Sequence, residues 1–122
     1  MINNQECLII FDPEHNPLGE ILFDQGACRQ INLNQAGEDL IGNHITDWQT
    51  NGLDESVTMQ APDFEQVFLL WLQDHGYLHL TMPLAAMIAW SEIQQMDIEQ
   101  QKKYELAVLL RDLPVHKLTR SF

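Results

Sequence analysis

The chain has 122 residues, of which 45% are hydrophobic and 8% aromatic. This length suits one domain that buries roughly two thirds of the surface of its unfolded form, and the composition is far from that of disordered proteins. Eighteen acidic residues outnumber six basic ones, for a formal net charge of −12. Such a surface repels nucleic-acid phosphates and anionic lipid and attracts basic proteins. We therefore expect no direct binding to nucleic acid or membranes.

The N-terminal residues lack the basic opening and the apolar stretch of a secretion signal. The longest apolar run, residues 84–90, has seven residues, whereas a membrane helix needs about 20. These features predict a cytoplasmic protein. Cys7 and Cys28 belong to no C-x-x-C pair, so we expect two reduced, buried thiols.

The first third of the chain predicts β-structure. Residues 7–11 and 20–23 are short apolar runs rich in β-branched and aromatic side chains, separated by turn residues that begin at Asp12. Residues 27–33 alternate between two faces, as a further strand does. These three segments should form an antiparallel meander.

The signal weakens between residues 34 and 60. Asn34 can cap a short helix, but Gly37 and Gly42 lower helix propensity, so we expect mainly irregular surface up to the Asn-Gly turn at residue 52. Residues 53–60 alternate enough to predict one more strand at an edge of the sheet.

From residue 62 onward the apolar period becomes helical. Asp63 is a suitable N-cap for a mostly buried helix that Gly76 ends. Strict alternation over 77–82 then predicts a strand, and the run 84–90 predicts a buried helix that begins near Pro83. A last helix is expected over 98–113, with Asp97 as its cap.

Together these segments predict a single α+β domain over residues 1–122, mainly β over 1–60 and mainly helical over 62–114. An antiparallel sheet comes from the N-terminal half, and two or three C-terminal helices pack on one face of it.

The most polar stretch inside an apolar background contains Asp74, His75, Tyr77 and His79. A helix-ending glycine between the two histidines disrupts the shared helical face that a metal pair of this spacing needs. The sequence also lacks a G-x-S-x-G motif and a glycine-rich phosphate loop. We expect no catalytic residue, no metal and no cofactor. A small enzyme or ligand binder that uses the His75/His79 region stays open as an alternative.

A segment rich in carboxylates around one tryptophan is the better candidate for a binding role. An aromatic anchor with a carboxylate rim suits a basic partner surface with an apolar centre. The predicted partner-binding residues are Glu38, Asp39, Asp47, Trp48, Asp54 and Glu55. The alternative is that Trp48 closes one end of the core.

These features predict a small acidic protein that binds, and inhibits, a basic protein by presenting carboxylates in place of phosphates. A nuclease toxin or a nucleic-acid-handling complex is the expected kind of partner, toward which the protein would act as a DNA mimic. Immunity proteins and phage-encoded inhibitors are similar to it in small size and acidity alone. A self-associating accessory subunit, a homodimer through residues 84–90 or 106–113, is the alternative. In that case the acidity serves solubility alone.

Overall fold

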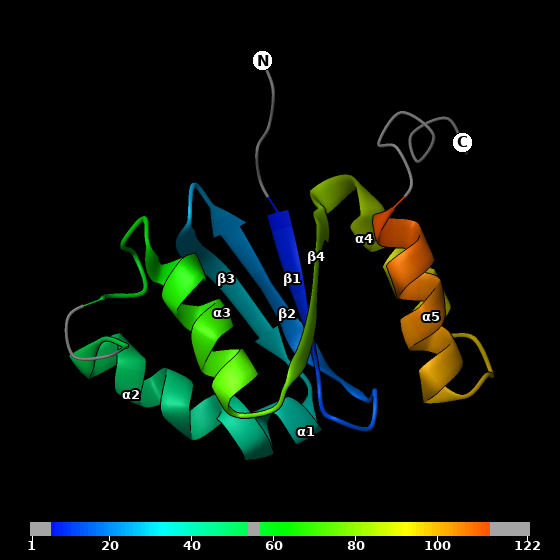
Figure 1. Ribbon diagram of the computed structural model, residues 1–122, viewed down its shortest axis with the longest axis horizontal. Coiled ribbons are helices and arrows are strands. Elements are labelled where there is room, and N and C mark those ends of the chain that lie inside the picture. The colour runs from blue at the N-terminus through cyan, green and yellow to red at the C-terminus, as the bar shows by residue number, and fades with distance from the viewer. Residues whose placement is uncertain (1–5, 54–56, 113–122) are drawn as a thin grey trace.

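In the computed structural model, which describes residues 6–53 and 57–112, an antiparallel sheet lies between two groups of helices (Figure 1). This is the α+β fold expected from the sequence. Within the described ranges, no helix has the length and apolar character needed to span a bilayer.

The sheet has four strands in the order β3-β2-β1-β4, and all neighbours pair antiparallel. Their bounds are β1 Glu6–Phe11, β2 Pro17–Asp24, β3 Ala27–Leu33 and β4 Leu78–Pro83. The first three form the expected meander. β4 returns from the helical half of the chain and pairs with the free side of β1, which makes β1 a central strand.

β1 is buried on both faces of the sheet. Leu8 and Ile10 belong to one hydrophobic cluster, and Ile9 and Phe11 belong to the other. All four side chains are fully buried. A strand covered on both faces reads as an unbroken apolar run and not as an alternation, which explains the absence of polar residues from 7–11.

One face of the sheet is covered by the α1–α3 layer, which we define as α1 Gln35–Gly37, the π-helical turn η1 Glu38–Gly42, α2 Asn43–Asn51 and α3 Phe64–Asp74. Asn34 caps α1 as expected, because its side-chain oxygen accepts a hydrogen bond of 2.8 Å from the backbone N–H of Gly37. The prediction of mainly irregular surface before residue 52 is wrong, since the chain is helical from residue 35 to residue 51.

Tertiary packing explains this difference from the sequence prediction. A Cβ at Gly37 would lie 2.1 Å from the carbonyl oxygen of Leu18 in β2, so only glycine lets the helix lie this close to the sheet. Glycine lowers helix propensity locally, but the contact with the sheet outweighs that cost.

The strand expected over 53–60 is also wrong for its described residues. Leu53 and Val57 form only an isolated bridge, and the carbonyl of Met59 accepts a hydrogen bond of 2.7 Å from the N–H of Cys28 at the edge of β3. Leu53 and Met59 are buried in the core. The apolar residues of this segment are therefore spaced as they are because Leu53 and Met59 each pack into the core, and not because they belong to a paired strand.

The opposite face is covered by the α4–α5 layer, namely the 3-10 turn η2 Leu84–Ala86, α4 Met87–Gln94 and α5 Gln100–Arg111. Two C-terminal helices thus share one face, whereas α3 lies on the other face with α2 (Figure 1). The two-sided apolar character of β1 requires helices on both faces. The expectation of two or three C-terminal helices on one face is thus confirmed for α4 and α5, and α3 is the helix from beyond residue 62 that lies on the other face.

Two details of the α4–α5 layer differ from expectation. Glu99, and not Asp97, occupies the cap position of α5. The run 84–90 is only partly buried, because Leu84 and Ile88 are 38% and 61% exposed. The predicted end of the last helix at residue 113 lies outside the described residues.

Candidate functional site

A hollow of about 460 Å3 opens between α2 and α3. Ligand sites in proteins typically have volumes of about 300–1,000 Å3. We call this hollow the tryptophan pocket, and its lining residues are Trp48, Leu53, Val67, Leu70, Trp71 and Asp74. Among the described residues, it combines two indole rings and aliphatic walls with one carboxylate, that of Asp74.

Trp71 is the centre of the aromatic wall of the pocket. Its ring stacks on His75 with the centroids 4.1 Å apart, and it meets Trp48 edge to face at 5.0 Å. His44 from α2 approaches the same ring edge-on at 5.1 Å, and Tyr77 stacks at 5.9 Å. Aromatic pairs in such geometries stabilise by about 0.5–1.5 kcal/mol each. These neighbours hold the indole of Trp71 in one orientation beside the pocket.

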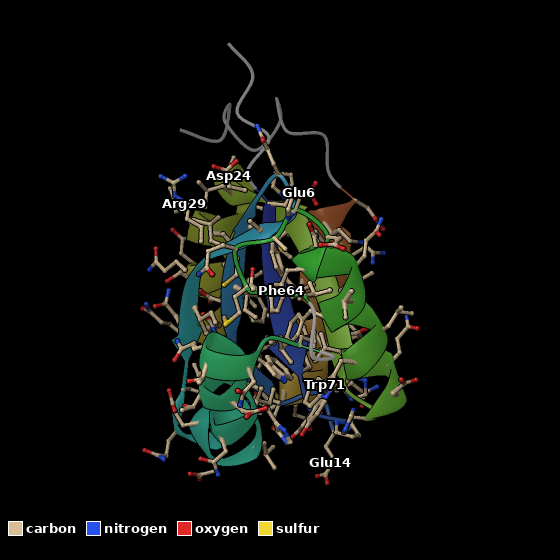
Figure 2. The ribbon with its side chains drawn as sticks, turned by 90° about the vertical axis from the view of Figure 1, so that its left-hand side faces the viewer. Glu6, Glu14, Asp24, Arg29, Phe64 and Trp71 are labelled. Carbon is tan, nitrogen blue, oxygen red and sulfur yellow. The ribbon has the colours of Figure 1, made fainter. Side chains whose placement is uncertain are left out.

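Trp48, the tryptophan predicted from the sequence, is a core residue. It is 5% exposed, and its ring packs edge to face against Phe68 at 5.7 Å. It therefore closes one end of the core, as the alternative interpretation held. Trp71 is the more exposed of the two indoles in the pocket. In Figure 2, Trp71 lies toward the end of the molecule opposite Arg29 and Asp24.

The predicted carboxylates fall into two groups. Glu38, Asp39 and Asp47 are exposed on η1 and α2, so they lie on the surface of the α1–α3 layer. Asp47 precedes Trp48 in the sequence, but none of these three carboxylates is among the described residues that line the pocket. Asp54 and Glu55 lie outside the described residues.

Three residues that line the pocket from α3, namely Val67, Leu70 and Trp71, were not predicted as binding residues, although α3 carries a signal for them. Val67, Leu70, Trp71 and Asp74 have the spacing i, i+3, i+4 and i+7, which places them on one helical face. This stripe is separate from the buried one formed by Phe64, Phe68 and Leu72. A second stripe that ends in a carboxylate indicates a helix face with a role other than core packing.

Charge is distributed unequally between the two layers. The sequence contains no Lys or Arg between Arg29 and Lys102, so the α1–α3 layer has none. Arg29 is paired with Asp24 through an Nη1 to Oδ2 distance of 2.8 Å. Lys102, Lys103 and Arg111 all belong to α5 on the other side of the sheet. The carboxylates around the tryptophan pocket therefore lack basic neighbours from their own layer.

The two histidines singled out in the sequence have different surroundings. The Nδ1 atom of exposed His75 lies 2.9 Å from the carbonyl oxygen of Trp71. His79 is half-buried in β4, where burial lowers the pKa of its imidazole. Neither residue lines the tryptophan pocket, and the described part of the chain has no group of three metal-ligating side chains.

The two cysteines are free thiols. Burial, with a smaller contribution from the negative charge of Glu20, raises the pKa of the Cys7 thiol to about 12. Burial raises the pKa of Cys28 to about 11. Because the thiolate is the nucleophile, neither side chain is activated for covalent chemistry at neutral pH.

Comparison with known proteins gives no relative: no protein family, no curated protein and no solved structure matches this chain.

Proposed function

We propose that this protein binds a basic segment of another protein at the tryptophan pocket and thereby blocks that partner's interaction with nucleic acid. The observation that carries the proposal is an aromatic pocket with a carboxylate at its edge, in a layer that contains no Lys or Arg.

The chemistry of the pocket suits a lysine or arginine side chain. A cation near an aromatic face is attracted by the ring quadrupole, by about 0.5–1 kcal/mol at exposed sites and more when water is excluded. Asp74 supplies the opposite charge, while Val67 and Leu70 supply apolar surface for the aliphatic stem of the incoming residue. Trp71 is held firmly by its aromatic neighbours, so little side-chain entropy is lost on binding.

The surrounding charge supports a partner that normally binds phosphate. Glu38, Asp39 and Asp47 add exposed carboxylates to the same layer, and the net charge of −12 attracts basic surfaces over a distance of about one Debye length. Carboxylates that occupy a phosphate-binding surface exclude nucleic acid from it. Binding and inhibition then have one cause.

Affinity capture with charge-matched baits tests this proposal. The first bait is the wild-type protein, and the second carries Asp39→Asn, Asp47→Asn and Asp74→Asn, which remove three charges from the α1–α3 layer. A lysate of the source organism is applied at low salt, and bound proteins are eluted by a salt step and identified. We expect a basic protein that the wild type retains and the triple variant loses.

The matched control carries Glu92→Gln, Asp97→Asn and Glu99→Gln, three exposed acids of the α4–α5 side of the molecule. This variant has the same net charge as the first triple variant and should retain the partner. Equal loss from both variants would mean that only total charge matters, and the pocket would have no role. The purified partner should also lose its nucleic-acid binding when the wild-type protein is added.

Self-association is a second candidate function, favoured by exposed aliphatic side chains on the α4–α5 layer. Leu84, Ile88 and Leu109 are 38%, 61% and 64% exposed. Light scattering would show a dimer mass for the wild type and a monomer mass for Ile88→Lys. A monomer mass for the wild type at high protein concentration would exclude this candidate.

A further inference from the structure

The α4–α5 layer leaves a second cavity on its side of the sheet. The cavity has a volume of about 190 Å3 and lies where η2 and the start of α4 meet β1, β2 and β3. Strand register explains its floor, because Leu22 pairs with Cys7 on one side and with Gln30 on the other. Paired residues in a sheet point to the same face, so these three side chains all face the α4–α5 layer. Leu84 and Met87 form the opposite wall.

Among the described residues, Glu20 is the one charged residue that lines this cavity. It pairs with Ile9 and Asn32, which places its carboxyl on the same face of the sheet, one register step from Leu22. Within the described residues it has no ion-pair partner. Burial raises the pKa of this carboxyl, and the neighbouring Trp90 offsets part of that rise. Burying the charged form of a carboxylate without a nearby cation costs free energy, so a positively charged ligand would stabilise the ionised Glu20.

The indole of Trp90 in α4 is a second feature beside Glu20. Its side chain is fully buried, and its indole N–H has no hydrogen-bond partner among the described residues. The N–H faces Glu20 closely enough to lower the pKa of that carboxyl, although no hydrogen bond of ordinary geometry joins them. Buried donors in folded proteins nearly always have a partner. A ligand that draws the Glu20 carboxylate into an ordered position would also give this donor its acceptor.

The two amide side chains at the cavity define the hydrogen-bonding pattern. Gln30 donates from Nε2 to Oδ1 of Asn32 over 3.4 Å, and among the described residues no donor is bonded to Oε1 of Gln30. The site thus offers a carboxylate and an amide oxygen as acceptors beside the aliphatic walls of Leu22, Leu84 and Met87. Acceptors beside apolar surface match an N–H-rich cation on a short alkyl stem.

We propose that this cavity binds an organic cation, an alkyl guanidinium or alkyl ammonium group, whose charged head lies between Glu20 and Gln30 and whose stem packs against Leu84 and Met87. The cavity is smaller than a typical site for a drug-sized molecule, so it holds the cationic group and about four carbons. This site is independent of the tryptophan pocket, which lies on the other face of the sheet.

The test is a titration of the 15N-labelled protein with N-butylguanidinium, followed through the indole N–H signals. The chain has three tryptophans. Trp90 reports on this cavity through its neighbour Glu20, while Trp48 and Trp71 line the tryptophan pocket and report on it. We expect a saturable shift of the Trp90 signal, with a dissociation constant on the order of millimolar, as such small ligands allow. The neutral analogue n-pentanol should give no saturable shift.

Glu20→Gln keeps the size of the side chain and should weaken binding by about tenfold to a hundredfold, the range for loss of a charge-assisted hydrogen bond. Glu65→Gln is the matched control, because Glu65 is another part-buried carboxyl whose pKa is raised by burial, and it lies outside this cavity. The control should bind like the wild type. Equal affinity of Glu20→Gln, or an equal response to pentanol, would overturn the proposal.

Nα-acetylarginine methylamide distinguishes the two sources of such a cation. A shift of Trp90 by both compounds supports the proposal and assigns the cation to an arginine side chain of a peptide. A shift by N-butylguanidinium alone supports it and assigns the cation to a free small molecule. If neither compound shifts Trp90 in the wild-type protein, the proposal is wrong, whatever the response of Trp48 and Trp71.

Discussion

Gly37→Ala should destabilise the protein, although alanine favours a helix more than glycine does. The exchange contributes about 1 kcal/mol of helix propensity. Against it, the new Cβ would lie 2.1 Å from the carbonyl oxygen of Leu18 and 3.2 Å from the Cβ of Leu33. The helix must move away, which costs about 1–3 kcal/mol as overpacking and about 1 kcal/mol for the hydrogen bond from the Asn34 N–H to that carbonyl. The net expectation is a loss of about 2 kcal/mol.

Gly42→Ala is the matched control from the same helical stretch. Its Cβ would meet only the flexible carboxylate end of Glu38, which can rotate away. It should therefore stabilise the protein, by up to about 1 kcal/mol. Urea unfolding of the three proteins, followed by circular dichroism, measures both effects. Stabilisation by Gly37→Ala would refute the close packing of α1 on β2, and with it the placement of the carboxylates of the α1–α3 layer.

Three further outcomes are expected. Iodoacetamide at pH 8 should leave Cys7 unmodified in the folded protein, because a thiol with a pKa of about 12 is almost wholly protonated there; rapid alkylation seen by mass spectrometry would contradict this. Glu20→Gln should raise the melting temperature at pH 7.5 but hardly at pH 4. The folded protein raises the pKa of the Glu20 carboxyl, so it loses stability as the pH rises and that carboxyl ionises. A change in melting temperature that is independent of pH would contradict this reasoning. Lys103→Met should lower the free energy of unfolding by about 1 kcal/mol, because it removes the buried hydrogen bond of 2.7 Å to the carbonyl of Gln94; unchanged urea denaturation would speak against that contact.

The strands and α3 could be predicted from the sequence because their patterns are local. Residues 77–82 alternate strictly, and β4 accordingly presents Leu80 and Met82 to one core cluster and the intervening His79 to the other face. Gly76 ends the preceding helix with a φ of 80°, as expected of a glycine in that position. In each case a few neighbouring residues determine the result.

The sequence also contains a signal for helices on both faces of the sheet. An apolar run without polar interruption at residues 7–11 indicates a strand buried on both faces. Helices on both sides of the sheet follow from that pattern, whereas a sheet covered on one face would show alternation in every strand. The unbroken apolar sequence of β1 was the signal for the α4–α5 layer.

The helix over 35–51 and the tryptophan pocket were harder to predict, because both depend on contacts between distant segments. In the sequence, Gly37 lowers the predicted helix propensity. Only the structure shows that the carbonyl of Leu18 packs against this glycine and leaves no room for a side chain. The stripe that contains Trp71 and Asp74 is visible in the sequence, but its apposition to Trp48 depends on how two helices pack. Propensity alone gives no information on such contacts.

The central claim is that the tryptophan pocket receives a basic side chain of a partner, and an NMR titration with a short peptide tests it most directly. The 15N-labelled protein is titrated with a capped Lys-Arg-Lys peptide and, separately, with a capped Glu-Gln-Glu peptide. We predict a saturable shift of the Trp71 indole N–H with the basic peptide only, reduced by added salt and by Asp74→Asn. A shift that survives Asp74→Asn unchanged, or that is absent from Trp71, would contradict the account.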